Sequence, residues 1–287
     1  MANEAQRENW NGASGRNWVE RQDQFDASNA VWADLLLATA APAPGERVLD
    51  IGCGCGATTL AAARAVGRDG QAVGADLSAP MLGVARSRAE RAGLPNAAFA
   101  VADAQTDDLA ALGRDERRPY DLAISRFGVM FFDDPPAAFA NIRAAVRPGG
   151  RLTFVCWGPL PHQEWLTVPL GAAGPVLGVA PGEEGPSPML SLADADHVTD
   201  LLRNAGWAEV ATAFEARPMN VGGARTVEQA AAFVAGTGAG RALFADAEPA
   251  RAEAAMAAIR KALAPHLTPD GVIVHGAVLV VTARRVE

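Results

Sequence analysis

The chain has 287 residues, of which 49% are hydrophobic and 20% charged, and its formal charge is -8. This composition is typical of a globular protein with a sizeable core, and the length suits one large α/β domain or two small ones. The acidic balance, without a run of Lys and Arg, argues against nucleic acid and against an anionic membrane as partners. A small organic substrate is the class that remains.

The N-terminal residues are polar and show no signal-peptide core, and no apolar run is long enough to span a bilayer. The three cysteines are Cys53, Cys55 and Cys156. Two cysteines that lie two residues apart are poorly placed for a shared disulfide, and no further cysteine completes a metal set. We therefore expect a cytoplasmic protein with reduced cysteines and no bound metal.

Predicted helices and strands alternate through the first half of the chain. A helix over 16–39 ends before Pro42, and an apolar strand at 47–51 leads into a glycine cluster. Helices follow over 58–66, 80–92 and 136–146, and strands at 71–76, 97–101, 120–125 and 151–157. Such alternation predicts a parallel sheet covered on both faces, which right-handed crossovers turn into an α/β, doubly wound, Rossmann-like layer.

The alternation stops after residue 157. A loop-rich segment at 158–190 holds one short helix at 164–172, and it is followed by a helix over 194–205, a strand at 208–217, helices over 226–234 and 248–264, and a last strand at 272–284. We therefore expect an N-terminal helical arm at 1–40, a core at 41–157, cap and acceptor-binding insertions at 158–271 that include one sheet strand (208–217), and a final core strand at 272–287.

The glycine cluster between the first strand and the next helix predicts a nucleoside-cofactor site. Gly52, Gly54 and Gly56 allow a sharp turn and a close approach of the backbone to a ligand. The helix N-terminus behind them offers unpaired N–H groups. Asp76, at the end of the second strand, is placed to hold ribose hydroxyls. This pattern also satisfies the dinucleotide motif G-x-G-x-x-G/A, so the glycines alone do not separate NAD from S-adenosylmethionine.

Three further features favour S-adenosylmethionine. Asp50 precedes the glycines, where a carboxylate would repel a pyrophosphate but suits a ligand with an ammonium and a sulfonium. Asp103 ends the third strand and can accept a hydrogen bond from an adenine amino group. An Arg-Pro-Gly-Gly-Arg-Leu motif at 147–152 joins a helix to the fifth strand.

With these motifs, the stretch from 48 to 157 resembles the cofactor domain of class I S-adenosylmethionine-dependent methyltransferases, and most of all the ubiquinone/menaquinone-type small-molecule group. The matching motifs, in this order along the chain, are VLDIGCGCG (48–56), GADLSAPM (74–81), ADA (102–104), YDLAISRF (120–127) and RPGGRL (147–152). The resemblance implies a seven-stranded sheet whose last strand is antiparallel.

The resemblance also implies a role for each cofactor-binding residue. The methionine part would be surrounded by Asp50, Gly52, Cys53, Gly54 and Gly56, and the ribose would be held by Asp76. The adenine would lie against Leu77 and Met81, with its edge hydrogen-bonded by Asp103 and Ala104. Ser125 would lie near the sulfonium. Two local alternatives stay open. Asp76 suits a turn or a helix cap, and Asp103 suits a cap of its own loop.

The acceptor side is less well defined by the sequence. Many relatives carry a His beyond the fourth strand, where this chain has the apolar run 129–132. His162 is the candidate general base, with a surface histidine as the alternative. Arg126 is a candidate catalytic residue that faces either the donated methyl group or solvent. Trp18, in the arm, either covers the cofactor or packs in the core.

We therefore expect an S-adenosylmethionine-dependent methyltransferase that acts on a small apolar or aromatic acceptor, such as a secondary metabolite or a quinone-like compound. In-line transfer needs mainly positioning and the exclusion of water. Two alternatives remain: a protein of this fold that binds the cofactor without methyl transfer, and an NAD-dependent oxidoreductase. The expected partner is a small-molecule acceptor, with no nucleic acid and no membrane, and a homodimer stays open.

Overall fold

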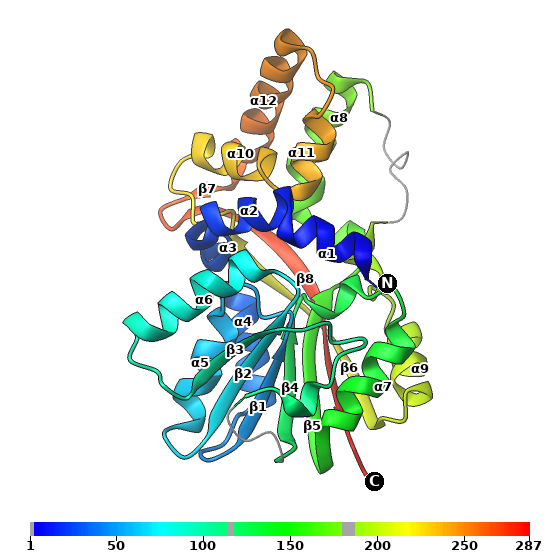
Figure 1. Cartoon of the computed structure of the whole chain (residues 1–287). Helices are drawn as coiled ribbons and strands as arrows, with labels where there is room; N and C mark the ends of the chain where they lie inside the picture. Colours follow the sequence, from blue (N-terminus) through cyan, green and yellow to red (C-terminus); the bar gives the residue numbers. More distant parts are fainter. Residues whose placement is uncertain (1–2, 114–117, 180–186) are drawn as a thin grey trace.

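A mixed sheet of strand order β3-β2-β1-β4-β5-β8-β6 forms the centre of the molecule (Figure 1). The computed structural model describes residues 3–113, 118–179 and 187–287. The strands of this path are β1 (Arg47–Ile51), β2 (Gln71–Asp76), β3 (Ala97–Val101), β4 (Tyr120–Arg126), β5 (Val146–Trp157), β6 (Ala208–Asn220) and β8 (Gly271–Arg284). An eighth strand, β7 (Leu267–Thr268), pairs only with β8.

The direction of the strands confirms the Rossmann-like sheet with an antiparallel last strand. β1 to β5 pair in parallel, whereas β8 runs antiparallel to both of its neighbours, β5 and β6. Parallel strands need crossover helices, and right-handed crossovers that lead outward in both directions from β1 and β4 place these helices on opposite faces. All five residues of β1 are buried, as expected for a strand covered on both sides.

Helices cover the two faces accordingly. On one face α4 (Ala30–Ala40) packs beside α5 (Ala57–Val66), and α6 (Ala79–Arg91) follows against β3. On the other face α7 (Pro135–Ala145) packs beside α9 (Ala195–Asn204), where the indole of Trp207 donates to the carbonyl of Phe139. The carboxyl ends of β1, β2, β3 and β4 therefore meet at one edge of the layer, where parallel α/β sheets bind ligands.

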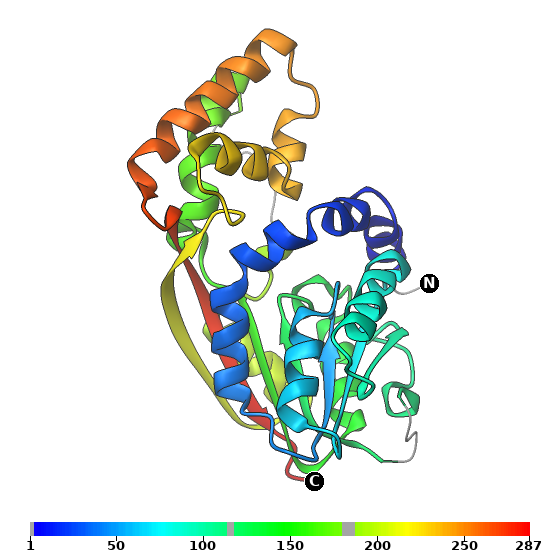
Figure 2. The same ribbon diagram turned by 90° about the vertical axis from the view of Figure 1, so that its left-hand side faces the viewer.

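The N-terminal arm consists of several short helices rather than the single helix predicted over 16–39. α1 (Glu4–Asn11), α2 (Ala13–Glu20), α3 (Gln22–Ser28) and α4 are separated by the single residues Gly12, Arg21 and Asn29. The breaks let the arm bend across the top of the sheet, below the cap (Figures 1 and 2). Contacts that are distant in sequence determine this path, because Arg21 donates to the carbonyl of Ala232.

A helical cap stands above the arm. It contains α8 (Glu164–Leu177), α10 (Val227–Ala235), α11 (Gly238–Phe244) and α12 (Pro249–Leu263). β6 and β8 extend beyond the other strands as a two-stranded ribbon that reaches the cap (Figure 2). Positions 180–186 of the predicted loop-rich segment lie outside the described residues. In the described part of the chain, no helix has the length and apolar character needed to cross a membrane.

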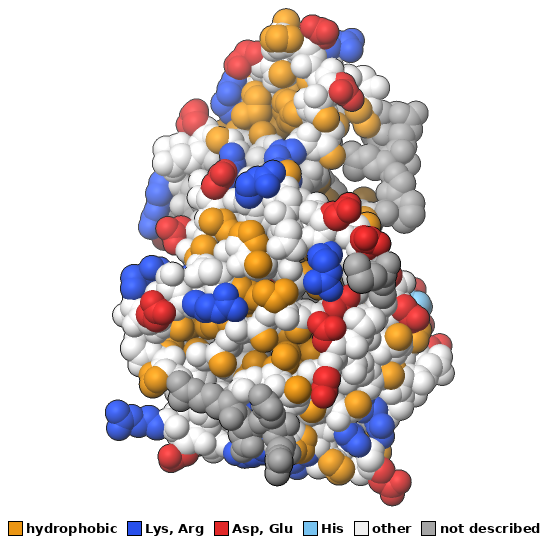
Figure 3. All heavy atoms as spheres, viewed as in Figure 1, with side chains coloured by type: hydrophobic (Ala, Val, Ile, Leu, Met, Phe, Trp, Pro, Cys, Tyr) orange, Lys and Arg blue, Asp and Glu red, His pale blue; other side chains and the backbone are white. Residues whose placement is uncertain are grey.

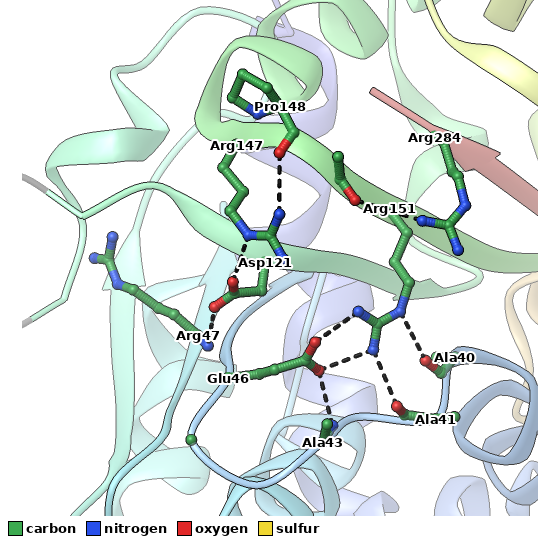
Figure 4. A network of polar contacts seen from close by, with 12 residues as sticks. Ala40, Ala41, Ala43, Glu46, Arg47, Asp121, Arg147, Pro148, Arg151 and Arg284 are labelled. Carbon is green, nitrogen blue, oxygen red and sulfur yellow. Dashed lines mark hydrogen bonds and ion pairs between the residues drawn. The ribbon is translucent and has the colours of Figure 1, made fainter. Parts of the chain in front are cut away.

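The Arg-Pro-Gly-Gly-Arg-Leu motif lies at the amino ends of the strands, far from the edge described above (Figure 4). Arg151 donates to both carboxylate oxygens of Glu46, at 2.6 and 2.8 Å, and Arg147 donates to Asp121 at 2.6 Å. These ion pairs connect β5 to β4 and to the turn before β1. The motif therefore stabilises the sheet and does not contact the candidate site.

Candidate functional site

A cavity of about 360 Å³ lies at the carboxyl ends of β1 to β5. Its walls come from the arm, from the core and from the cap. The sequence-predicted residues that line it are Trp18, Gly52, Cys53, Gly54, Asp76, Leu77, Met81, Asp103, Ala104 and Arg126. Asp50, Gly56, Ser125 and His162 are not among the lining residues.

The glycine turn passes very close to the end of β4. Gly52 has φ +64°, and a Cβ at this position would lie 2.6 Å from the Cα of Gly128. Only glycine combines this conformation with this approach. The hydroxyl of Ser125 donates to the carbonyl of Ile51 at 2.8 Å and accepts from the N–H of Gly128 at 3.2 Å. Ser125 thus fastens β4 to the glycine turn from behind the cavity wall.

Asp50 lies behind the turn and is fully buried. Its Oδ2 accepts hydrogen bonds from the hydroxyls of Thr58 and Thr59, both at 2.6 Å, so the carboxylate positions the first turn of α5. Its Oδ1 has no hydrogen-bond partner. Burial raises the pKa of Asp50 to about 6, against the opposing effect of the two threonine hydroxyls and the nearby Arg126. The site therefore holds a buried carboxyl oxygen without a donor.

Asp76 lines the cavity at the end of β2. Its Oδ2 accepts from the N–H of Gly54 and its Oδ1 from the N–H of Ser78, both at 2.8 Å. A carboxylate oxygen can accept more than one hydrogen bond, so each oxygen of Asp76 keeps a lone pair for a ligand. Burial raises the pKa of Asp76, and the backbone donors at Ser78 and Gly54 oppose that rise. Asp76 is thus both a brace of the glycine turn and a candidate acceptor.

Asp103 lies at the end of β3, beside a residue of the arm. Its Oδ1 accepts from the side-chain amide of Asn3 at 2.8 Å and from the N–H of Gln105 at 2.9 Å. Its Oδ2 is buried without a hydrogen-bond partner, and the nearest cation, Arg7, is 3.8 Å away. Asn3 also exchanges two hydrogen bonds with Asp133. The end of the arm therefore fixes one oxygen of Asp103 and leaves the other buried without a hydrogen bond.

Aromatic side chains form a large part of the cavity wall. The ring of Phe127 stacks on Trp157, with centroids 4.1 Å apart, and Trp157 contacts Trp165 of α8 at 5.0 Å. In the arm, Trp18 stacks on Phe25 at 3.9 Å. Phe127 has φ +64°, which is strained for a non-glycine residue and is typical of functional sites. This half of the cavity suits a flat, apolar ligand.

His162 lies outside the cavity. It is exposed, and its ring packs edge-on against Phe214 of the outer strand β6, with centroids 5.0 Å apart. The neighbouring Gln163 is fully buried and donates to the carbonyls of Gly158 and Ala277. The histidine is thus distant from the candidate chemistry, and the glutamine holds the start of α8 in place.

Sequence reasoning overlooked several lining residues, among them Asn3, Asp26, Asn29, Trp157 and Trp165. Trp157 could have been predicted from its position as the last residue of the fifth strand, because ligands bind at the carboxyl ends of the strands in such a sheet. The arm residues carry no comparable signal, since only the folded path of α1 to α4 brings them to the cavity.

Comparison with known proteins identifies the core. Residues 48–150 match a family model described as a methyltransferase domain. The aklanonic acid methyltransferase DauC of Streptomyces sp. (strain C5) is 38% identical over 119 residues, which cover 42% of this chain and 51% of that protein. The nocamycin O-methyltransferase of Saccharothrix syringae is 31% identical over 192 residues, 62% of this chain and 65% of that protein. Residues 48–150 of the chain are thus a methyltransferase domain, and this region is similar to S-adenosylmethionine-dependent small-molecule methyltransferases.

The chain spans 51% and 65% of the length of these two curated relatives. The YcgJ protein from Bacillus subtilis has the same fold, with a TM-score of 0.54 and 18% sequence identity, and the match covers 89% of this chain and 99% of that one.

The described residues of the cavity fit S-adenosylmethionine, the cofactor of methyltransferase domains of this kind. Two buried carboxyl oxygens lack a donor, Oδ1 of Asp50 and Oδ2 of Asp103. Asp103 lines the cavity, so an adenine amino group there would supply a favourable partner near its free oxygen, whereas Asp50 lies behind the cavity wall. Cys53 and Cys55 stay neutral thiols, because burial raises the pKa of Cys53 well above its ordinary value and that of Cys55 to about 12. No cluster of metal-ligating side chains occurs among the described residues.

Proposed function

We propose that this protein transfers a methyl group from S-adenosylmethionine to a small, flat, apolar or aromatic acceptor. The observation that carries the proposal is a single cavity that joins the cofactor-facing residues to an aromatic wall. Gly54 and Asp76 line one part of it, and Phe127, Trp157 and Trp165 line the other. An acceptor stacked on this wall lies next to the end of β4 and the glycine turn.

The residues of the chain act mainly by positioning. The cofactor supplies a methyl group that is already activated by the sulfonium. The aromatic rings hold the acceptor and exclude water, and correct alignment of two reactants contributes about 7–11 kcal/mol to lowering a barrier. The cap and the arm close the cavity from above, since Phe233 of α10 and Trp18 of α2 line it together.

The relatives support an acceptor of this class. One carries aklanonic acid in its name, and another is named for O-methylation of nocamycin. We extend to this chain only the class, a compact organic acceptor. Surface charge agrees with this choice, because on the face in Figure 3 the Lys and Arg side chains are scattered among acidic ones and form no broad basic field.

Two measurements test the proposal. Thermal-shift titration should show stabilisation by S-adenosylmethionine and S-adenosylhomocysteine and none by NAD(H), and a ligand at 100 times its Kd stabilises by about 2.7 kcal/mol. Incubation with a panel of aromatic acids, phenols and quinols should then yield S-adenosylhomocysteine and a product heavier by one methylene. Stabilisation by NAD alone would refute the cofactor assignment. Cofactor binding without product from any acceptor would instead support the alternative of a protein that binds the cofactor without methyl transfer.

The aromatic wall has its own test. Replacement of Trp165 by Ala should lower kcat/KM for the acceptor by about 10- to 100-fold, because a large, partly buried aromatic contact is lost. The Kd of S-adenosylhomocysteine should stay within about threefold, since Trp165 belongs to α8 of the cap. A parallel loss of cofactor affinity would show that the tryptophan does not belong to the acceptor half.

A further inference from the structure

Arg126 is a buried cation with incomplete partners. It is the last residue of β4, and its side chain is only 10% exposed. Its recorded contacts are long: 3.5 Å to the carbonyl oxygen of Asn29 and 3.7 Å to Oδ1 of Asp26. A guanidinium carries five N–H donors, and leaving them unpaired away from water is costly. Since Arg126 also lines the cavity, it has donors available for a ligand there.

The nearby carboxylate of Asp26 does not fill this need. Its Oδ2 accepts from Arg88 at 2.7 Å and from Gln22 at 2.6 Å, so its charge is already balanced by another arginine. Arg88 in turn donates to the carbonyl of Cys55 and does not line the cavity. Arg126 is thus the cation of this cluster that both faces the cavity and lacks a close anion.

The order of the strands indicates which part of a bound cofactor would lie nearest to Arg126. Along the sheet, Asp103 follows β3, Asp76 ends β2, the glycine turn follows β1, and Arg126 ends β4. An adenosine held by the first two carboxylates would direct the amino-acid end of the cofactor along the glycine turn toward β4. The α-carboxylate is the anionic group of S-adenosylmethionine, and arginine binds carboxylates through paired, charge-assisted hydrogen bonds.

We propose that Arg126 binds the α-carboxylate of the cofactor's methionine part. The inference rests on the proposed use of S-adenosylmethionine, and it makes Arg126 a cofactor-binding residue rather than a group that acts on the acceptor. Asn29 and Asp26, which also line the cavity, make only the two long contacts described above with the guanidinium. The aromatic wall beyond Phe127 is then left for the acceptor alone.

Isothermal titration with two ligands tests this assignment. S-Adenosylhomocysteine carries the carboxylate, and its decarboxylated analogue lacks only that group. In Arg126→Gln the Kd of S-adenosylhomocysteine should rise about 10- to 100-fold, the loss expected for a charged hydrogen-bonded pair. The Kd of the decarboxylated analogue should change less than about threefold. Arg126→Lys should recover part of the affinity, and Arg86→Gln, on the outer surface of α6, serves as the matched control.

The outcomes separate this inference from the proposed function. Equal weakening of both ligands would overturn it, because Arg126 would then only support the fold of the site. Unchanged affinity for both ligands, together with a higher KM for the acceptor, would overturn it in favour of an acceptor-binding role. Failure of the unaltered protein to bind S-adenosylhomocysteine would instead refute the cofactor assignment itself.

Discussion

Asp50→Asn gives a specific test of the buried carboxyl behind the glycine turn. Burial raises the pKa of Asp50 from 3.8 to about 6 in the folded protein without cofactor. The folded state therefore holds this proton more tightly than the unfolded chain, so the contribution of Asp50 to stability is greatest below about pH 4 and is lost as the pH rises through about 6. Ionising Asp50 costs about 3 kcal/mol more in the folded protein than in the unfolded chain. About half of this loss of folding stability occurs between pH 5 and pH 8.

The asparagine has no charge to lose and keeps an oxygen for Thr58 and Thr59. Its amide N–H groups face a site without an acceptor, so the variant starts with a constant penalty of about 1–3 kcal/mol. The informative quantity is the difference in the free energy of unfolding between the two proteins. From pH 5 to pH 8 the unaltered protein should lose about 1.5 kcal/mol of stability relative to the variant.

Urea denaturation of the cofactor-free proteins at several pH values measures this quantity. Glu253→Gln is a suitable control, because Glu253 is 75% exposed on α12 and its removal should leave the pH dependence unchanged. A difference between Asp50→Asn and the unaltered protein that stays constant from pH 5 to pH 8 would show that Asp50 ionises at its ordinary pKa. The raised pKa of Asp50 would then be wrong.

Three further predictions concern the glycine turn, the ion pairs of the sheet and the arm. Gly52→Ala should lower the free energy of unfolding by at least about 2 kcal/mol, because its Cβ would lie 2.6 Å from the Cα of Gly128. The control Gly45→Ala, at φ +81° with open space around it, should lower it by only about 1–2 kcal/mol. Equal losses for the two variants in thermal denaturation would contradict the close approach. Burial alone would raise the pKa of Glu46, but Arg151 holds that pKa below its ordinary value, so this pair loses its stabilising effect as the pH falls through the lowered pKa. Acid-titration curves of Glu46→Gln should lack that part of the loss, and curves that coincide with those of the unaltered protein would refute it. Asn3→Ala frees one oxygen of Asp103, so the Kd of S-adenosylhomocysteine should rise about 5- to 30-fold in calorimetry, and an unchanged Kd would remove the arm from the adenine site.

The core of the fold was predictable because its elements are specified locally. β1, β2 and β3 begin and end where the apolar runs at 47–51, 71–76 and 97–101 predicted. Each run is short, apolar and bounded by turn residues, and the glycine turn follows the first of them directly. In this part of the chain, neighbouring residues contain all the information that the strand needs.

The arm and parts of the cap were not predictable, since their shape depends on distant partners. Asn3 meets Asp103 across 100 positions of sequence, and Arg21 meets the carbonyl of Ala232 across 211. α11 begins with Gly-Ala-Gly, a sequence without helical preference, and Thr237 caps it by accepting from Gly240. Local patterns do not report such contacts, so one long helix was expected over 16–39.

The residues of the candidate site also fall into those that local sequence predicts and those that it does not. Asp76 and Asp103 follow strands that were predicted correctly, and both line the cavity. His162 was chosen for its position after β5, but the local turn points Gln163 inward and leaves the histidine at the surface. Whether one residue or its neighbour faces a cavity depends on the register of a turn, which chain order alone does not define.

The cap consists of two separate segments of the chain, one before β6 and one between β6 and β8. α8 enters directly after β5, whereas α10, α11 and α12 lie between β6 and β8, and the two groups pack against each other. Neither group covers the cavity alone. A change of acceptor made by exchanging cap segments between relatives must therefore transfer both segments as a matched pair, while the cofactor half can remain as it is.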